Sequence, residues 1–395
     1  MKVIGEKIKI ARLIANKTIT ELADKIEISK QAVSQFEREE VVPKMETLFK
    51  ISNVLGFPVS FFTTPYYENL EQRNTFFRSL RSTSISAKNK YNEKTKLLLR
   101  IYDYFEQYLE MPELNLPDLK ASIDLSSFDY DAIANKVREV WGLNERPIWN
   151  MVDLLEQHGI VMSVLKDESE KIDAFTFVDR KNNKNRFCVM LENEKNSMAR
   201  RNFSIAHELG HILLHSCFNL NEEEIEDSVI IEKEANCFAA AFLLPKDAFN
   251  ASLKYPRSLD HYIDLKSKWH VSIKAMLNRA KELNRISQEE YISLIKKYNY
   301  RLSKISSKDD RMEPLDDVIP LEKPELFETA LKTLFGAKVF KDYREFMQEL
   351  TKLGCGVEEK ILYDIMSLSD KFFDKYKTEP IVLNLKERVL IKNNS

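Results

Sequence analysis

The sequence is poor in glycine and cysteine, and both shortages exclude classes of protein. Only eight glycines occur in 395 residues, and none stands in a GxxxxGK[S/T] or GxGxxG pattern. Nucleotide-binding loops of these types are therefore not expected. The four cysteines are widely separated and include no CxxC pair. This spacing indicates neither a disulfide framework nor a cysteine-based zinc finger.

Long apolar runs are also missing. No segment approaches the roughly 18 apolar residues that a membrane-spanning helix needs. The N-terminal MKVIGEKIKIARLI mixes charged with apolar residues and lacks the apolar core of a signal peptide. With 44% apolar and 31% charged residues, the composition is that of a folded globular protein. We therefore expect a cytoplasmic protein that does not associate with membranes.

A strong net charge is absent as well, because the formal charge is only −2. This value argues against polyanion binding by the whole surface. Charge is concentrated locally, since residues 71–100 contain eight Lys or Arg against two Glu, which gives +6. Such a segment is either a solvated linker or, beside a DNA-binding domain, a source of additional phosphate contacts.

The length and the apolar pattern predict four regions. Residues 1–64 form a compact all-α domain of five short helices, and residues 65–128 form a basic, helical connector. Residues 129–300 mix helices with short strands, and residues 301–395 are mostly helical and of unknown role. The predicted fold class is therefore multidomain, an all-α domain followed by an α+β domain and a helical C-terminal region.

Local signals define the helices of the first region. Residues 18–21 have the S/T-x-x-E form of a capping box and open a short helix. Ser29 can cap the next helix, residues 30–38, and Gly56 ends a helix over residues 47–55. Two capped helices joined by a short turn are typical of the helix-turn-helix arrangement, whose second helix enters the major groove of DNA.

The third region contains alternating helices and strands, judged from periodicity, length and β-branched content. Strands are predicted at residues 160–165, 172–178 and 187–191. Helices are predicted at residues 131–141, 148–158, 197–215 and 231–244. Pro245 ends the last of these helices.

The segment SIAHELGHILLHSC, residues 204–217, holds three of the six histidines. His207 and His211 are four residues apart, so their rings project from one helix face a turn apart and can hold one zinc ion. Glu208 lies beside them, where it can take a proton from water and pass it to a leaving amine. His215 is too far along the helix to share the ion, and a structural role is expected for it.

A catalytic zinc ion needs a third protein ligand and an open position for water. Acidic side chains lie in the downstream segment IEKEANCFAAAFLLP, residues 231–245, where Glu232 and Glu234 are the candidates. Glu232 stands 21 residues after His211, enough for a second helix to fold back beside the first. Asn236, one turn after Glu232, can orient a ligand histidine.

These segments resemble the ImmA/IrrE family of zinc metallopeptidases over residues 145–285. The similarity rests on RNFSIAHELGHILLH, on E-x-x-A-N-x-F-A-A-x-x-L-L-P, on the upstream IDAF and RFCVMLEN, and on the downstream LKSKWHVSIKAMLNRA. The resemblance implies an α+β zincin-like (gluzincin) domain that binds Zn²⁺. It makes His207, His211 and Glu232 the metal ligands and Glu208 the general base. Glu234 is the rival third ligand. Glu232 is favoured because a polar residue follows the ligand glutamate after four positions in similar peptidases.

Residues 4–64 resemble the XRE (lambda-repressor-like, Cro/cI) family, on LADKIEISKQAVSQFERE and the following PKMETLFKISNVLGFPVSFF. The resemblance implies double-stranded DNA as a partner. Carried over by position, the base or phosphate contacts are Lys30, Gln31, Ser34 and Gln35. Glutamine suits adenine, and lysine suits guanine or phosphate. Ile19 departs from the family, which usually has a glutamine there that contacts phosphate. A homodimer is expected because two DNA-binding domains related by two-fold symmetry match a palindromic DNA site.

Two classes of function follow from these resemblances. In the first, the chain is a transcription regulator with a zinc-dependent endopeptidase domain that cleaves a repressor-type protein in a stress or mobile-element response. In the second, the zinc domain is a sensor with little or no proteolysis. A component of a toxin–antitoxin or phage-response locus is a third reading. Glu208 favours the first class, because a purely structural metal requires no general base.

Overall fold

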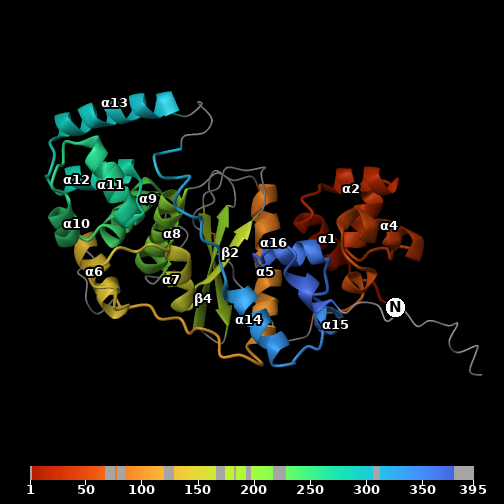
Figure 1. The fold of residues 1–395 in the computed structure, drawn as a ribbon. Helices are drawn as coiled ribbons and strands as arrows, with labels where there is room; N and C mark the ends of the chain where they lie inside the picture. The colour runs from red at the N-terminus through yellow and green to blue at the C-terminus, as the bar shows by residue number, and fades with distance from the viewer. Residues whose placement is uncertain are drawn as a thin grey trace, which may run out of the picture.

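A computed structural model describes residues 2–66, 76–77, 85–119, 129–165, 174–181, 184–192, 197–216, 228–305 and 312–377. The N-terminal helices lie at one end of the molecule and a group of helices from the middle of the chain lies at the other, with a small sheet between them (Figure 1). Within the described ranges, no helix is long and apolar enough to cross a membrane.

The N-terminal domain consists of α1 (Gly5–Ile14), α2 (Ile19–Ile26), α3 (Lys30–Glu37), α4 (Met45–Leu55) and the 3-10 helix η1 (Val59–Phe62). The predicted capping box is confirmed at α2. The Thr18 hydroxyl accepts from the N–H of Glu21 at 3.1 Å, and the Glu21 carboxylate accepts from the N–H of Thr18 at 2.7 Å. Ser29 caps α3 as predicted. Gly56 ends α4 with a φ of 73°, in the left-handed region that favours glycine.

One sheet contains β1 (Phe76–Phe77), β2 (Val161–Leu165), β3 (Ala174–Lys181) and β4 (Lys184–Glu192), in the order β1-β3-β4-β2. β3 is antiparallel to both β1 and β4, whereas β2 is parallel to β4. The three predicted strands are confirmed, although β3 and β4 extend further into polar sequence. Residues 172–173 of the second predicted strand lie outside the described residues.

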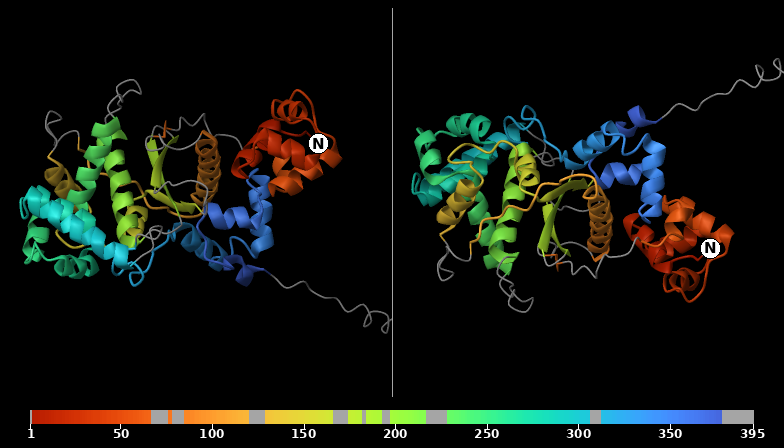
Figure 2. Two further views of the ribbon diagram at one scale, coloured as in Figure 1. Left: turned by 90° about the horizontal axis from the view of Figure 1, so that it is seen from above. Right: turned by 90° about the horizontal axis from the view of Figure 1, so that it is seen from below.

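The alternation of side chains along the strands divides the interior into two cores. On β4, Cys188 and Met190 pack into the first core, whereas Phe187, Val189 and Leu191 pack into the second. Figure 2 shows α5 (Ile85–Phe105) on one face of the sheet, and α8 (Met198–Gly210) with α9 (Ser228–Leu243) on the other. The sheet is therefore the middle layer between two layers of helices.

The first core runs from the N-terminal domain through α5 and the sheet to the C-terminal helices. These helices are α14 (Leu326–Gly336), α15 (Tyr343–Lys352), α16 (Glu359–Ile365) and the 3-10 helix η4 (Phe372–Tyr376). Lys7 Nζ on α1 donates to the Gly354 carbonyl at 2.7 Å, and Ser163 Oγ on β2 donates to the Ile365 carbonyl at 2.7 Å. The C-terminal helices thus contact both the N-terminal domain and the sheet.

The second core lies on the other side of the sheet, around α8 and α9. The helices that surround them are α6 (Tyr130–Val140), α7 (Met151–Gln157), α10 (Lys246–Ser252), α11 (Leu259–Trp269), α12 (Ile273–Glu282) and α13 (Gln288–Ile305). The predicted fold class, an all-α domain followed by an α+β domain with a helical C-terminal region, is confirmed.

Candidate metal centre

The predicted histidine helix is present, and it changes geometry at His211. The hydroxyl of Ser197 caps α8 by accepting from the N–H of Arg200 at 3.3 Å. After α8 ends at Gly210, the chain continues as the π-helix η2 (His211–Ser216). π-helical turns are rare and are frequent at functional sites. The widened turn carries both His211 and His215.

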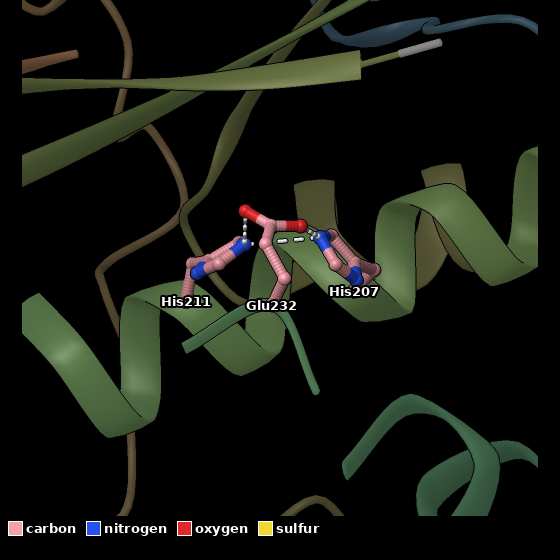
Figure 3. A group of neighbouring side chains, drawn as sticks. All are labelled: His207, His211 and Glu232. Atoms are coloured by element: carbon pink, nitrogen blue, oxygen red, sulfur yellow. Dashed lines mark hydrogen bonds and ion pairs between the residues drawn. The ribbon is translucent and has the colours of Figure 1, made fainter. Parts of the chain in front are cut away.

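Three side chains from two helices converge at this point (Figure 3). His207 Nε2 and His211 Nε2 are 2.9 Å apart. Glu232 on α9 places Oε2 3.2 Å from His207 Nε2 and Oε1 3.4 Å from His211 Nε2. Zinc ligands at about 2.0–2.2 Å in a tetrahedral arrangement lie roughly 3.4 Å from one another. Two imidazole nitrogens and one carboxylate at these spacings therefore fit a zinc ion.

Glu232 reaches the two histidines because α9 packs directly against α8. A Cβ atom on Gly210 would lie 3.1 Å from Ala235 Cα and 3.1 Å from the Phe238 ring. The missing side chain therefore allows the two helix backbones to approach closely. The Glu232 side chain is 48% exposed, so solvent reaches the cluster from one side.

The contacts within the cluster shift the ionisation of its members. When protonated, the His207 and His211 rings donate hydrogen bonds to Glu232, and these contacts hold the pKa of Glu232 far below its usual range. Burial by itself would lower the pKa of His207, but the hydrogen bond with Glu232 and the charges of Glu208 and Glu232 outweigh burial and raise this pKa. Glu232 is therefore ionised at neutral pH, which is the state that a metal ligand needs.

Asn236 orients His207 from the next turn of α9. Asn236 Nδ2 donates to the Glu232 carbonyl at 2.8 Å, which leaves Oδ1 facing His207 Nδ1 at 3.1 Å. His207 can then carry its proton on Nδ1 and present the lone pair of Nε2 to the cluster. This is the contact that the four-residue spacing from Glu232 predicts.

Glu208 is buried and has a partner that sequence reasoning missed. Only 3% of Glu208 is exposed, and its Oε2 accepts from Thr176 Oγ1 at 2.6 Å. Thr176 lies on β3, and its neighbours Phe175 and Phe177 pack into the first core on the opposite face. In the sequence, the sign of this contact is that Thr176 stands between two aromatic residues of a predicted strand, so its hydroxyl points to the opposite face of the sheet. The sequence could not show that this face of β3 lies against α8.

His215, the third histidine of this segment, pairs with Glu234, the rival candidate for the third ligand. His215 Nε2 lies 3.0 Å from Glu234 Oε2, and His215 Nδ1 lies 3.0 Å from His211 Nδ1. His215 and Glu234 are therefore on the far side of His211 from Glu232. Of the two candidates for the third ligand, the structure brings Glu232 and not Glu234 together with the two Nε2 atoms.

The candidate DNA contacts lie on α3. Lys30 and Gln31 are exposed on its first turn, whereas Ser34 and Gln35 are half-buried on the second. Arg38 Nη2 donates to Ser34 Oγ at 2.9 Å, which places an exposed guanidinium beside this set. The sequence reasoning did not single out Arg38, although its position four residues after Ser34 places both on the same helix face.

Comparisons with known families support both halves of this description. Residues 8–62 match the model described as helix-turn-helix, and residues 155–281 match the model described as IrrE N-terminal-like domain, a peptidase family. The two resemblances expected from the motifs are thereby confirmed.

Among solved structures, a transcriptional regulator from Mycobacterium tuberculosis is similar at 17% sequence identity and a TM-score of 0.28. The match covers 48% of this chain and 52% of that one, so it spans about half the length of the regulator. A comparison with curated proteins finds no match.

Proposed function

We propose that this chain is a DNA-binding transcription regulator with a zinc-dependent endopeptidase domain, and that its substrate is a repressor-type protein. The observation that carries the proposal is the convergence of His207, His211 and Glu232 beside the buried Glu208. A helix-turn-helix domain on the same chain supports a substrate found at DNA, because it brings the peptidase domain to proteins bound there.

Each residue has a distinct part in the proposed hydrolysis. His207, His211 and Glu232 hold the ion, and Asn236 keeps the Nε2 atom of His207 directed at it. When bound, zinc polarises a carbonyl and acidifies water. Glu208 takes the proton of the attacking water and delivers it to the leaving amine. The Thr176 hydroxyl fixes Oε2 of Glu208, and Oε1 is then the oxygen that carries this proton.

The metal assignment is tested by zinc content. We expect one zinc per chain in the purified protein and its loss in His207→Ala. Glu208→Gln should retain the metal and lose proteolysis, because it removes the base but no ligand. His270→Ala is the matched control, since His270 contacts Trp149 outside the cluster. Wild-type protein that binds no zinc would exclude the site.

The substrate is sought by comparing cells that express wild-type protein or Glu208→Gln. Genome-wide DNA occupancy identifies the sites to which both variants bind. Proteins at these sites that disappear only with the wild type are candidates for cleavage. Equal levels of every such protein in the two strains would contradict a peptidase function.

DNA recognition is assigned to α3, with two copies of the chain on a palindromic site. Gln31→Ala should weaken specific binding by about 1–3 kcal/mol, because an adenine contact is lost. Lys50→Ala, on the neighbouring helix α4, removes a surface charge instead of a base contact. A gel-shift titration on the operator should show the larger loss for Gln31→Ala. Equal affinity of Gln31→Ala and wild type for the specific site would contradict the placement of α3 in the major groove.

A second candidate function, a transcription regulator whose zinc domain is a sensor, is supported by the continuous first core. Phe175 and Phe177 of β3 pack into this core, which continues to the N-terminal domain, whereas Thr176 between them contacts Glu208 on the other face of the sheet. Through this strand, metal occupancy can affect DNA binding without any cleavage. In this case Glu208→Gln remains fully functional as a regulator. Operator affinity measured for Glu208→Gln with and without zinc separates the two functions, since only a sensor predicts a difference between these two titrations.

A further inference from the structure

A line of hydrogen-bonding groups extends from His211 away from the metal cluster. His211 Nδ1 lies 3.0 Å from His215 Nδ1, and His215 Nε2 lies 3.0 Å from Glu234 Oε2. Both histidines are 2% exposed, and the Glu234 side chain is 15% exposed. Two buried histidines thus connect a candidate ligand atom to a carboxylate on the neighbouring helix.

The chemistry of the groups fixes the direction of this line. An ionised carboxylate only accepts, so His215 Nε2 must carry the hydrogen that lies between it and Glu234. The neutral ring of His215 then has a lone pair on Nδ1, which accepts from Nδ1–H of His211. His211 therefore has its lone pair on Nε2, the atom that faces Glu232 and His207. Glu234 thus selects the tautomer in which His211 can bind metal.

We propose that His215 and Glu234 are positioning residues that fix the tautomer and the ring orientation of His211 as a metal ligand. This inference rests on the proposed zinc site, and it assigns to both residues a role beyond filling the core. Partners of this kind behind ligand histidines typically change metal affinity by 10- to 100-fold.

The two candidate ligand histidines are supported in different ways. His207 lies near the exposed side of the cluster, and the neutral amide of Asn236 is enough to orient it. His211 is deeply buried, and an unoriented imidazole there has two tautomers of which only one can bind the ion. A line that ends in a carboxylate removes this ambiguity. The π-helical turn holds the two Nδ1 atoms at hydrogen-bonding distance.

The test measures zinc affinity by competition with a chromophoric chelator, on the folded full-length chain. His215→Phe fills a similar volume without an acceptor, and Glu234→Ala removes the terminal carboxylate. We expect both to raise the dissociation constant for zinc roughly 10- to 100-fold. His215→Gln and Glu234→Gln retain a carbonyl oxygen that can accept, so both should remain much closer to wild type.

Matched controls separate positioning from a merely structural role. Glu139→Ala makes the same substitution at an exposed site on α6 and should leave zinc affinity unchanged. Thermal unfolding without metal reports the structural effect of each variant. A lower Tm of His215→Phe or Glu234→Ala with an unchanged zinc dissociation constant overturns the proposal. If His215→Phe does not fold, the comparison of Glu234→Ala with Glu234→Gln decides, because that side chain lies partly at the surface.

The tautomer itself can be observed, because the chain has only six histidines. Nitrogen NMR of the histidine-labelled protein with zinc should show His211 protonated on Nδ1. An Nε2–H tautomer of His211 would refute the proposed direction. Absence of zinc binding by the wild type would instead refute the proposed function, so the two failures are distinguishable.

Discussion

Glu208 shows how a buried carboxyl group is held in this fold. A buried carboxylate is costly unless hydrogen bonds replace the water that it loses. Thr176 Oγ1 supplies such a bond at 2.6 Å, from a strand that reaches α8 only in the folded chain. Thr176 therefore replaces part of the hydration that Glu208 loses on burial and holds its Oε2 in place.

We expect Thr176→Val to lower the free energy of unfolding by about 1–3 kcal/mol, because it leaves buried Glu208 without this donor in a side chain of nearly the same shape. Thr176→Ser is the matched variant, since it keeps the hydroxyl and loses only a methyl group. Urea denaturation of the two variants and wild type measures the difference. If Thr176→Val is as stable as Thr176→Ser, the hydrogen bond contributes nothing to stability.

At the scale of elements, α14 depends on a side chain from a distant helix. Its N-cap residue Glu325 makes no side-chain capping bond. Glu156 of α7 instead accepts from the N–H groups of Glu325 and Leu326, both at 3.0–3.3 Å. Burial raises the pKa of Glu156 to about 7, although these two N–H donors act in the opposite direction. The docking of α14 is thereby linked to one ionisable group.

The sign of this linkage is set by the raised pKa. The folded state holds the Glu156 proton more tightly than the unfolded state, so its contribution to stability is full below about pH 4.5 and is lost by about pH 7. Since one pKa unit corresponds to about 1.4 kcal/mol, the loss is at most roughly 3 kcal/mol. Glu156→Gln keeps an acceptor and should not lose stability over this range. Urea denaturation from pH 4.5 to 7.5, with exposed Glu139→Gln as control, should show the wild type falling below Glu156→Gln. Parallel pH profiles would contradict the linkage.

The helices and the metal-cluster histidines could be predicted because their signals are local. The capping box at Thr18 and the four-residue spacing of His207 and His211 depend only on nearby residues. The choice between Glu232 and Glu234 could not be made from spacing alone, because both lie on the same short stretch of α9. The structure separates them through the position of α9 against α8. The pairing of β1 with β3 was not foreseen, since two residues carry no periodic signal.

At the scale of the whole molecule, the C-terminal helices connect the two ends of the chain. Phe346 of α15 is fully buried and packs against Phe105 of α5 and Phe335 of α14. Through α5, the same core continues to α1. The C-terminal helices α14 and α15 had no predicted role because their aromatic side chains pack against α5, more than two hundred residues away. Contacts of this kind leave no trace in local sequence patterns.

Because α1, α5 and α15 share one core, we expect a mutation in that core to destabilise all three. Phe346→Ala should lower the free energy of unfolding by about 3–5 kcal/mol, because it leaves a cavity in the first core. Hydrogen exchange followed by mass spectrometry should then show α1 losing protection together with α5 and α15, although α1 lies more than three hundred residues away. The matched variant is Phe249→Ala, which empties the second core beside Trp269.

Phe249→Ala removes the same side chain from an equally buried position, so its cavity should cost a similar amount. Its effect should remain among α8 to α12, because the sheet separates this core from the N-terminal domain. Loss of protection in α1 by both variants would mean that the molecule unfolds as one unit. Loss by neither would mean that the N-terminal domain is stable alone. We expect α1 to lose protection in Phe346→Ala and to keep it in Phe249→Ala. This is the outcome if the C-terminal helices couple the N-terminal domain to the sheet that covers the candidate metal centre.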